Sequence, residues 1–267
     1  MPFAKLAGLD FYYERKGEGP CLLFISGTGQ DLRQKPSVLD SPLPRSFDVL
    51  AYDQRGLGQS AKPDIPYTMA DYADDAARLM DAVGWKSARV LGMSFGGMVA
   101  QEFALRHPGK VERLALACTS SGGRGGASYP LQTVMHLKGE ERVRRLIALD
   151  NTNRDEAWIA AHPEQFALML KMMGGEDPFA NEPGREQGMR RQLEARVGHD
   201  TWERLPQLKC PVLIAAGKYD GIAPPENQKK MAAQMPHSTL QFFEGGHTFM
   251  LENPAAYPAI IKFLAEA

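Results

Sequence analysis

The segment GMSFGG (residues 92–97) lies between the apolar run ARVLGM (88–93) and a stretch of helix-forming residues. A strand that turns directly into a helix strains the residue at the turn, and glycines beside it let the two elements approach closely. The hydroxyl of Ser94 is then expected at the carboxyl end of the strand, where the first N–H groups of the helix favour negative charge. The pattern predicts a nucleophile at Ser94, although a glycine-rich turn with no catalytic role would show the same sequence pattern.

Short apolar runs alternate with helical patterns on both sides of this segment. The runs are too uniformly apolar for a sheet with one face in water. Alternation of strand and helix implies right-handed crossovers and a parallel sheet with helices on both faces, so the fold class is α/β. The predicted strands are CLLFIS (21–26), FDVLAYD (47–53), ARVLGM (88–93), VERLALAC (111–118), PVLIAAG (211–217) and TLQFFE (239–244).

The helices of this alternation are predicted from periodicity and from stop signals. A helix over 69–83 begins with a capping box at Thr68 and Asp71, and a second helix starts at Phe95 and must stop at Pro108. Two further helices are expected near 225–235 and from about Pro254 to the end.

The strand rhythm breaks between residues 122 and 205. This stretch contains long helix-forming segments, LQTVMHLKGEERVRRLIALD (131–150) and AWIAAHPEQFALMLKMM (157–173), separated by glycine, proline and asparagine. We therefore predict a core domain formed by residues 1–121 and 206–267, with residues 122–205 inserted as a helical cap.

A serine nucleophile needs a histidine base and a carboxylate that orients the histidine. Among six histidines, His247 stands a few residues after a predicted strand, between Gly246 and Thr248, where flexible backbone could bring its ring over the sheet edge. Asp220 follows another predicted strand by a few residues and so reaches the same edge. We predict Ser94 as nucleophile, His247 as general base and Asp220 as the orienting acid.

Two backbone N–H groups are candidates for stabilising an oxyanion. The N–H of Phe95 follows the nucleophile directly, and the N–H of Thr28 lies in the loop SGTG (26–29) after the first long apolar run. An ordinary tight turn is the alternative for SGTG. The nearby turn DQRGLGQS (53–60) also carries charged residues, but we expect Asp53 to tie its loop together and to take no part in catalysis.

Composition excludes several classes of partner. The chain has 267 residues, with 31 basic and 32 acidic side chains, so neither nucleic acid nor an anionic membrane is an expected partner. The N-terminal segment lacks the features of a signal peptide, and no apolar run is long enough to span a bilayer. We expect a soluble, cytoplasmic protein that needs no cofactor and no metal, because its histidines and cysteines do not cluster at ligand spacing. A homodimer is left open.

The motifs together resemble the α/β-hydrolase superfamily across nearly the whole chain. They are SGTG (26–29), DQRGLGQS (53–60), GMSFGG (92–97), KYDGIAP (218–224) and GGHTFMLENP (245–254). The resemblance implies a mostly parallel eight-stranded sheet, a helical cap, and a triad in the order Ser94, Asp220, His247. Relatives commonly have histidine where Ser26 stands, which leaves the second oxyanion donor open. Small bacterial carboxylesterases and enol-lactone hydrolases are the most similar members in general layout.

These observations predict a serine hydrolase that cleaves a carboxylic ester or lactone through an acyl-serine. The partner is then a small acyl substrate. A C–C bond hydrolase or enol-lactonase with the same triad, and a ligand-binding sensor that retains the triad, are the alternatives. Apolar side chains that could line the acyl pocket are Trp158, Phe166, Met169, Met173 and Phe249.

Arginines of the predicted cap could bind a carboxylate on the substrate, although a solvated helix face is the favoured explanation for them. They are Arg142, Arg144, Arg145, Arg190 and Arg191.

Overall fold

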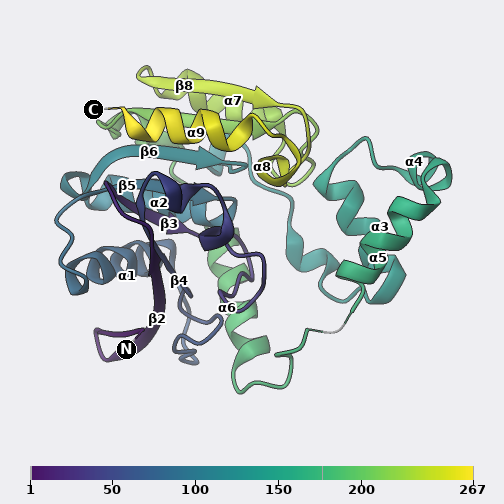
Figure 1. The fold of residues 1–267 in the computed structure, drawn as a ribbon, viewed down its shortest axis with the longest axis horizontal. Helices are drawn as coiled ribbons and strands as arrows, with labels where there is room; N and C mark the ends of the chain where they lie inside the picture. The colour runs from purple at the N-terminus through teal and green to yellow at the C-terminus, as the bar shows by residue number, and fades with distance from the viewer. Residues whose placement is uncertain (1, 176, 267) are drawn as a thin grey trace.

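The computed structural model describes residues 2–175 and 177–266. Eight strands form one sheet in the order β1-β2-β4-β3-β5-β6-β7-β8 (Figure 1). Strands β3 to β8 run parallel, while β1 and β2 pair antiparallel with each other and β2 pairs antiparallel with β4. The strands are β1 (Phe3–Leu6), β2 (Leu9–Lys16), β3 (Cys21–Ile25), β4 (Asp48–Tyr52), β5 (Ala88–Met93), β6 (Val111–Ala117), β7 (Val212–Gly217) and β8 (Ser238–Phe243).

Helices cover both faces of the sheet, as the alternating pattern predicts. One apolar cluster joins the sheet to α1 (Met69–Ala82), α2 (Phe95–Arg106) and α7 (Pro225–Gln234). A second cluster on the other face includes side chains of α8 (Phe249–Glu252) and α9 (Ala256–Ala265). The mostly parallel α/β sheet with two helical layers is therefore confirmed.

Local signals in the sequence set several helix ends. Thr68 caps α1, and its hydroxyl and the Asp71 carboxylate form the reciprocal hydrogen bonds of a capping box. Helix α2 ends at Arg106, two residues before Pro108. The antiparallel pair β1–β2 has no apolar run of its own, which is why strand patterning alone does not predict it.

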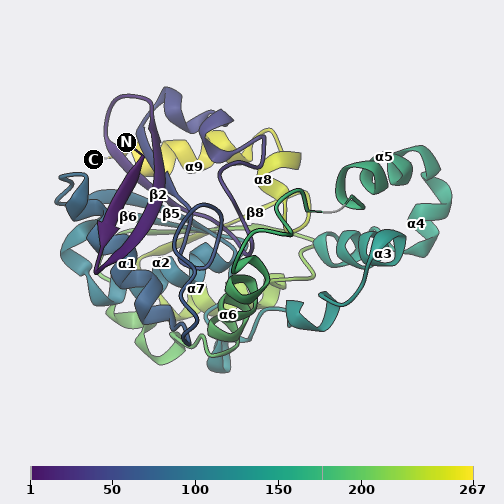
Figure 2. The ribbon, with the colours of Figure 1, turned by 90° about the horizontal axis from the view of Figure 1, so that it is seen from below.

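The segment between β6 and β7 contains α3 (Gly139–Asp150), α4 (Glu156–Ala161), α5 (Pro163–Met173) and α6 (Arg185–Val197). Figures 1 and 2 show α3, α4 and α5 as a lobe that projects away from the sheet, whereas α6 lies back against the body of the molecule. The lobe has its own small core around Val143, Ile147, Ile159 and Phe166. The division into a core of 1–121 and 206–267 and a cap of 122–205 stays a prediction.

Both long helix-forming stretches of this segment are divided in the structure. Residues 131–150 begin with a short 3-10 turn at Leu131–Val134 and become helical again at Gly139, whose φ of 52° breaks the run. In residues 157–173 the break lies between His162 and Pro163, because proline begins a new helix at its first position. Within the described residues, no helix combines the length and apolar character that a bilayer-spanning segment needs.

Candidate active site

Ser94 lies at the sharp turn between β5 and α2. Its φ of 55° and ψ of −117° are rarely adopted by a residue with a side chain, and such strain costs about 1–3 kcal/mol. Two hydrogen bonds of 2.8 Å hold the turn: the Ser94 N–H donates to the Ala117 carbonyl, and the Thr119 hydroxyl donates to the Ser94 carbonyl. The strained residue is thus fixed from the neighbouring strand β6.

The glycines of GMSFGG are required by close backbone approach. A Cβ on Gly92 would overlap the Gly96 carbonyl, and a Cβ on Gly96 would overlap the carbonyl of Ile25. The start of α2 is therefore pressed against the ends of β5 and β3. This contact brings the first N–H groups of α2 to the edge of the sheet from which the loops after β3, β7 and β8 emerge.

The three residues predicted as a triad form one hydrogen-bond chain. The Nε2 atom of His247 lies 2.8 Å from the Ser94 Oγ, and its Nδ1 atom lies 2.8 Å from Oδ2 of Asp220. The other carboxylate oxygen, Asp220 Oδ1, accepts the N–H groups of Ile222 and Ala223, each at 2.8 Å. With both oxygens bonded and its side chain inaccessible to solvent, Asp220 holds one orientation toward the imidazole.

The loop that carries His247 is fastened to the end of α3. The His247 N–H donates to the Asp150 carbonyl at 2.6 Å, and the Thr248 N–H and hydroxyl both donate to Oδ1 of Asp150. Burial raises the pKa of Asp150, while the Thr248 hydroxyl lowers it. Nothing in the helical pattern around Asp150 predicts its contact with Thr248, 98 positions later in the chain.

The loop after β3 lies close to Ser94. A Cβ on Gly27 would lie 3.5 Å from the Ser94 Cβ, so the backbone of this loop is close to the serine. Within residues 2–175 and 177–266, neither the Thr28 N–H nor the Phe95 N–H donates a backbone hydrogen bond. The oxyanion role of these two N–H groups stays a prediction.

Two glutamine side chains hold the loop after β3 through hydrogen bonds. The Gln54 Nε2 donates to the carbonyl of Ser26 at 2.8 Å, and the Gly29 N–H donates to Oε1 of Gln192 at 2.9 Å. Gln192 is fully buried and lies on α6. The segment inserted between β6 and β7 therefore contacts the loop next to Thr28 directly, a contact that the sequence gave no signal for.

Asp53 joins two loops through hydrogen bonds, as a structural role requires. Its two carboxylate oxygens accept the N–H groups of Leu32 and Gln59, each at 2.8 Å, and so join the loops after β3 and β4. Burial raises the pKa of Asp53 to about 6. It makes no hydrogen bond to Ser94, His247 or Asp220 in the described residues.

A family model of the alpha/beta hydrolase fold matches residues 20–254. The chain belongs to the α/β-hydrolase family. The strand order and the eight-stranded, mostly parallel sheet agree with that membership, and the chain is accordingly a hydrolase.

Individual relatives of this hydrolase act on different bonds, judged by their names. A protein of Caulobacter sp. (strain K31), named as the carbamate hydrolase RutD, is 31% identical over 229 residues, covering 82% of this chain and 81% of the relative. The poly(3-hydroxyalkanoate) depolymerase of Ectopseudomonas oleovorans is 26% identical, covering 92% and 84%. The crystal structure of the enol-lactonase from Burkholderia xenovorans LB400 shares the fold, with a TM-score of 0.79, 22% identity and coverage of 99% and 100%.

The five side chains predicted for an acyl pocket lie in different surroundings. Phe249 is fully buried in the sheet core of the hydrolase, where its ring stacks on Phe243 at 5.1 Å between centroids. Phe166, Trp158 and Met169 belong to the small core of the α3–α5 lobe. Met173 is 38% exposed on α5. A pocket role for any of them stays a prediction.

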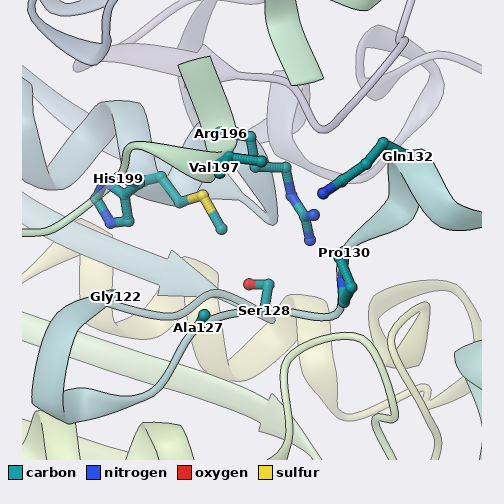
Figure 3. Close-up of a pocket in the computed structure, with 9 residues that line it drawn as sticks. Gly122, Ala127, Ser128, Pro130, Gln132, Arg196, Val197 and His199 are labelled. Atoms are coloured by element: carbon teal, nitrogen blue, oxygen red, sulfur yellow. The ribbon is translucent and has the colours of Figure 1, made fainter. Parts of the chain in front are cut away.

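A cavity of about 130 Å³ lies near the C-terminal end of α6, and none of those five residues lines it (Figure 3). Ser94, Asp220 and His247 do not line it either. Its walls come from α2, from the segment after β6 and from α6, and they consist of Met98, Gly122, Ala127, Ser128, Pro130, Gln132, Arg196, Val197 and His199. Burial lowers the pKa of His199 to about 4, so this imidazole is neutral at physiological pH.

The described residues contain no group of three or more histidine, cysteine, aspartate or glutamate side chains that could hold a metal ion.

Proposed function

We propose that this protein is a serine hydrolase that cleaves a carboxylic ester or lactone of a small to medium substrate through an acyl-serine intermediate. The observation that carries the proposal is the hydrogen-bond chain from Ser94 through His247 to Asp220, located at the strained turn after β5. A serine hydroxyl is a weak nucleophile, and an adjacent imidazole with an orienting carboxylate is the arrangement that activates it.

In the proposed first step, Oγ of Ser94 attacks the acyl carbonyl carbon while Nε2 of His247 takes the hydroxyl proton. The N–H groups of Thr28 and Phe95 hold the oxyanion, and Asp220 stabilises the imidazolium that forms. The tetrahedral intermediate then expels the alcohol, which receives the proton from His247.

In the second step a water molecule, deprotonated by His247, attacks the acyl-serine. The second tetrahedral intermediate uses the same two N–H groups, and its collapse releases the carboxylic acid and restores the Ser94 hydroxyl. Because Asp220 is held by the N–H groups of Ile222 and Ala223, His247 keeps one orientation through both steps.

The experiment that tests this function is initial-rate hydrolysis of p-nitrophenyl esters of increasing acyl length by wild type and Ser94→Ala. Ser87→Ala is the matched control, because Ser87 precedes the same strand β5 at its other end. We expect Ser94→Ala to lose turnover by a factor of at least about 10³ and Ser87→Ala to keep it. Equal rates for wild type and Ser94→Ala would refute the proposal.

A second candidate reaction is hydrolysis of an enol-lactone or a C–C bond in an anionic substrate by the same three residues. One observation favours it over neutral esters, a buried arginine that faces the cavity beside α6.

A further inference from the structure

Arg196 is a buried cation without a counter-charge. It is 6% exposed, the same fraction as Arg55, whose guanidinium makes two hydrogen bonds to the Asp75 carboxylate. Arg196 makes no salt bridge within the described residues, and the one hydrogen bond of its guanidinium there runs from Nη1 to the carbonyl of Tyr129 at 2.6 Å. Its Nε and Nη2 atoms are buried without a hydrogen-bond partner in the structure.

An unpaired guanidinium in this position destabilises the folded protein unless a ligand pairs with it. An isolated buried charge costs several kcal/mol, and buried polar groups in folded proteins are nearly always satisfied. Burial lowers the pKa of Arg196 to about 10, which still leaves the guanidinium protonated at pH 7. The position of Arg196 in the last turn of α6 favours a cation, but the helix dipole contributes only about 0.3–1 kcal/mol.

The surroundings of Arg196 form a pocket with a polar end and an apolar body. Figure 3 shows the guanidinium reaching toward Pro130, with the Gln132 amide beside it and Ser128 on the facing wall. The Ser128 hydroxyl is also buried without a partner, so it can donate to the same ligand. Met98 and Val197 supply apolar walls, and none of the lining residues is acidic.

The pocket lies close to the proposed nucleophile. Met98, one of its walls, is four residues after Ser94 on α2, and its N–H donates to the Ser94 carbonyl at 3.3 Å. Four residues advance a helix by about 6 Å, the length of a short carbon chain. One wall of the cavity, Met98, thus stands one turn of α2 away from Ser94.

We propose that the cavity lined by Arg196 and Ser128 binds a free carboxylate, and that the acyl substrates of this protein carry that carboxylate at the end away from the scissile bond. The forked guanidinium is matched to the two oxygens of a carboxylate, and Nε and Nη2 are the adjacent pair of donors that such a group requires. This inference rests on the proposed function, because it names the substrate class of the same site.

A purely structural role for Arg196 makes different predictions. If its only task were to join α6 to the Tyr129 carbonyl, Arg196→Met would lower the melting temperature and leave ligand recognition unchanged. The carboxylate site predicts the reverse, because methionine removes a buried unpaired charge and should keep or raise the melting temperature. Arg78→Met is the matched control, since Arg78 lies on α1, does not line the cavity and has its side chain 45% exposed.

The first test measures binding without turnover. Isothermal titration of Ser94→Ala with the monomethyl esters of succinate, glutarate and adipate is compared with titration by the corresponding neutral dimethyl esters. We expect at least one monoester to bind at least tenfold more tightly than its diester. The Arg196→Met substitution should weaken that binding about 100-fold, which corresponds to about 3 kcal/mol, while Arg78→Met leaves it unchanged. Equal binding of monoester and diester, or no effect of Arg196→Met, would overturn the carboxylate site.

The second test asks whether the carboxylate belongs to the substrate. With wild type, the preferred monoester should be hydrolysed with a higher kcat/KM than its diester, and Arg196→Met should abolish the preference chiefly through KM. Monoester binding that depends on Arg196 but does not compete with a p-nitrophenyl ester would refute the substrate assignment. If wild type hydrolyses no ester while the binding difference persists, the ester function fails and the carboxylate site stands.

Discussion

Replacement of Asp220 by asparagine should inactivate the enzyme without unfolding it. Oδ1 of Asp220 accepts two backbone N–H groups, from Ile222 and Ala223, whereas Oδ2 faces Nδ1 of His247. In Asp220→Asn the amide oxygen must keep the two backbone donors, so the amide NH2 group turns toward Nδ1. That nitrogen then has to accept a hydrogen bond, and the imidazole proton moves to Nε2.

An imidazole with its proton on Nε2 cannot take the proton of Ser94. The loss of this proton transfer, together with the lost stabilisation of the imidazolium, is about 10⁴-fold in kcat in enzymes with the same arrangement, or about 5 kcal/mol. The assay is steady-state hydrolysis of p-nitrophenyl acetate, with the melting temperature and far-UV circular dichroism as folding controls. A folded Asp220→Asn enzyme that retains more than a tenth of the wild-type kcat would refute the assigned role of Asp220.

Three further predictions concern residues that support the site. Gln192→Leu removes the acceptor for the Gly29 N–H, and we expect kcat to fall about tenfold with little change in KM. The reason is that a misplaced oxyanion loop weakens binding of the transition state more than binding of the substrate. An unchanged kcat in a folded variant would exclude a positioning role for Gln192. Asp150→Ala removes the acceptor of both Thr248 donors, so the melting temperature and kcat should both fall, and an unaltered kcat would show that the His247 loop does not depend on α3. Burial of His199 favours its neutral form, so its contribution to stability is complete above about pH 6.5 and is lost as the pH falls toward 4. Chemical denaturation of wild type and His199→Gln should show their difference in unfolding free energy shrinking by about 3 kcal/mol over that range. Asp53, whose pKa is raised, changes the unfolding free energy with pH in the opposite direction, but it is present in both proteins and its contribution cancels in the comparison. A difference in unfolding free energy that stays constant with pH would contradict a buried neutral His199.

The parts of the fold that could be predicted are those that local sequence determines. Uniform apolar runs indicated the six strands from β3 to β8, and the capping box at Thr68 placed the start of α1. The turn at Ser94 was predictable because strand, glycines and helix are adjacent in the chain. His247 and Asp220 could be proposed for a similar reason, since each follows a strand whose carboxyl end is at the same edge of the sheet.

The features that escaped prediction depend on packing between distant segments. Arg196 belongs to an ordinary polar helix in the sequence, like Arg190 and Arg191, and only the docking of α6 against residues 127–132 buries it. Gln192 reaches the loop after β3 for the same reason. Nor could the pattern foresee that α6 would separate from the α3–α5 lobe, because this placement depends on contacts of α6 with segments far away in the chain.

In the proposed mechanism Ser94 becomes covalently acylated. It is tested most directly by mixing the protein with p-nitrophenyl acetate, quenching with acid within the first turnover, and locating the added acetyl group by peptide mass spectrometry. One acetyl group is expected on Ser94 in wild type, and none at this position in Ser94→Ala, which has no hydroxyl to acylate. Hydrolysis by wild type with no acetyl group on Ser94, or with the group on another residue, would contradict it.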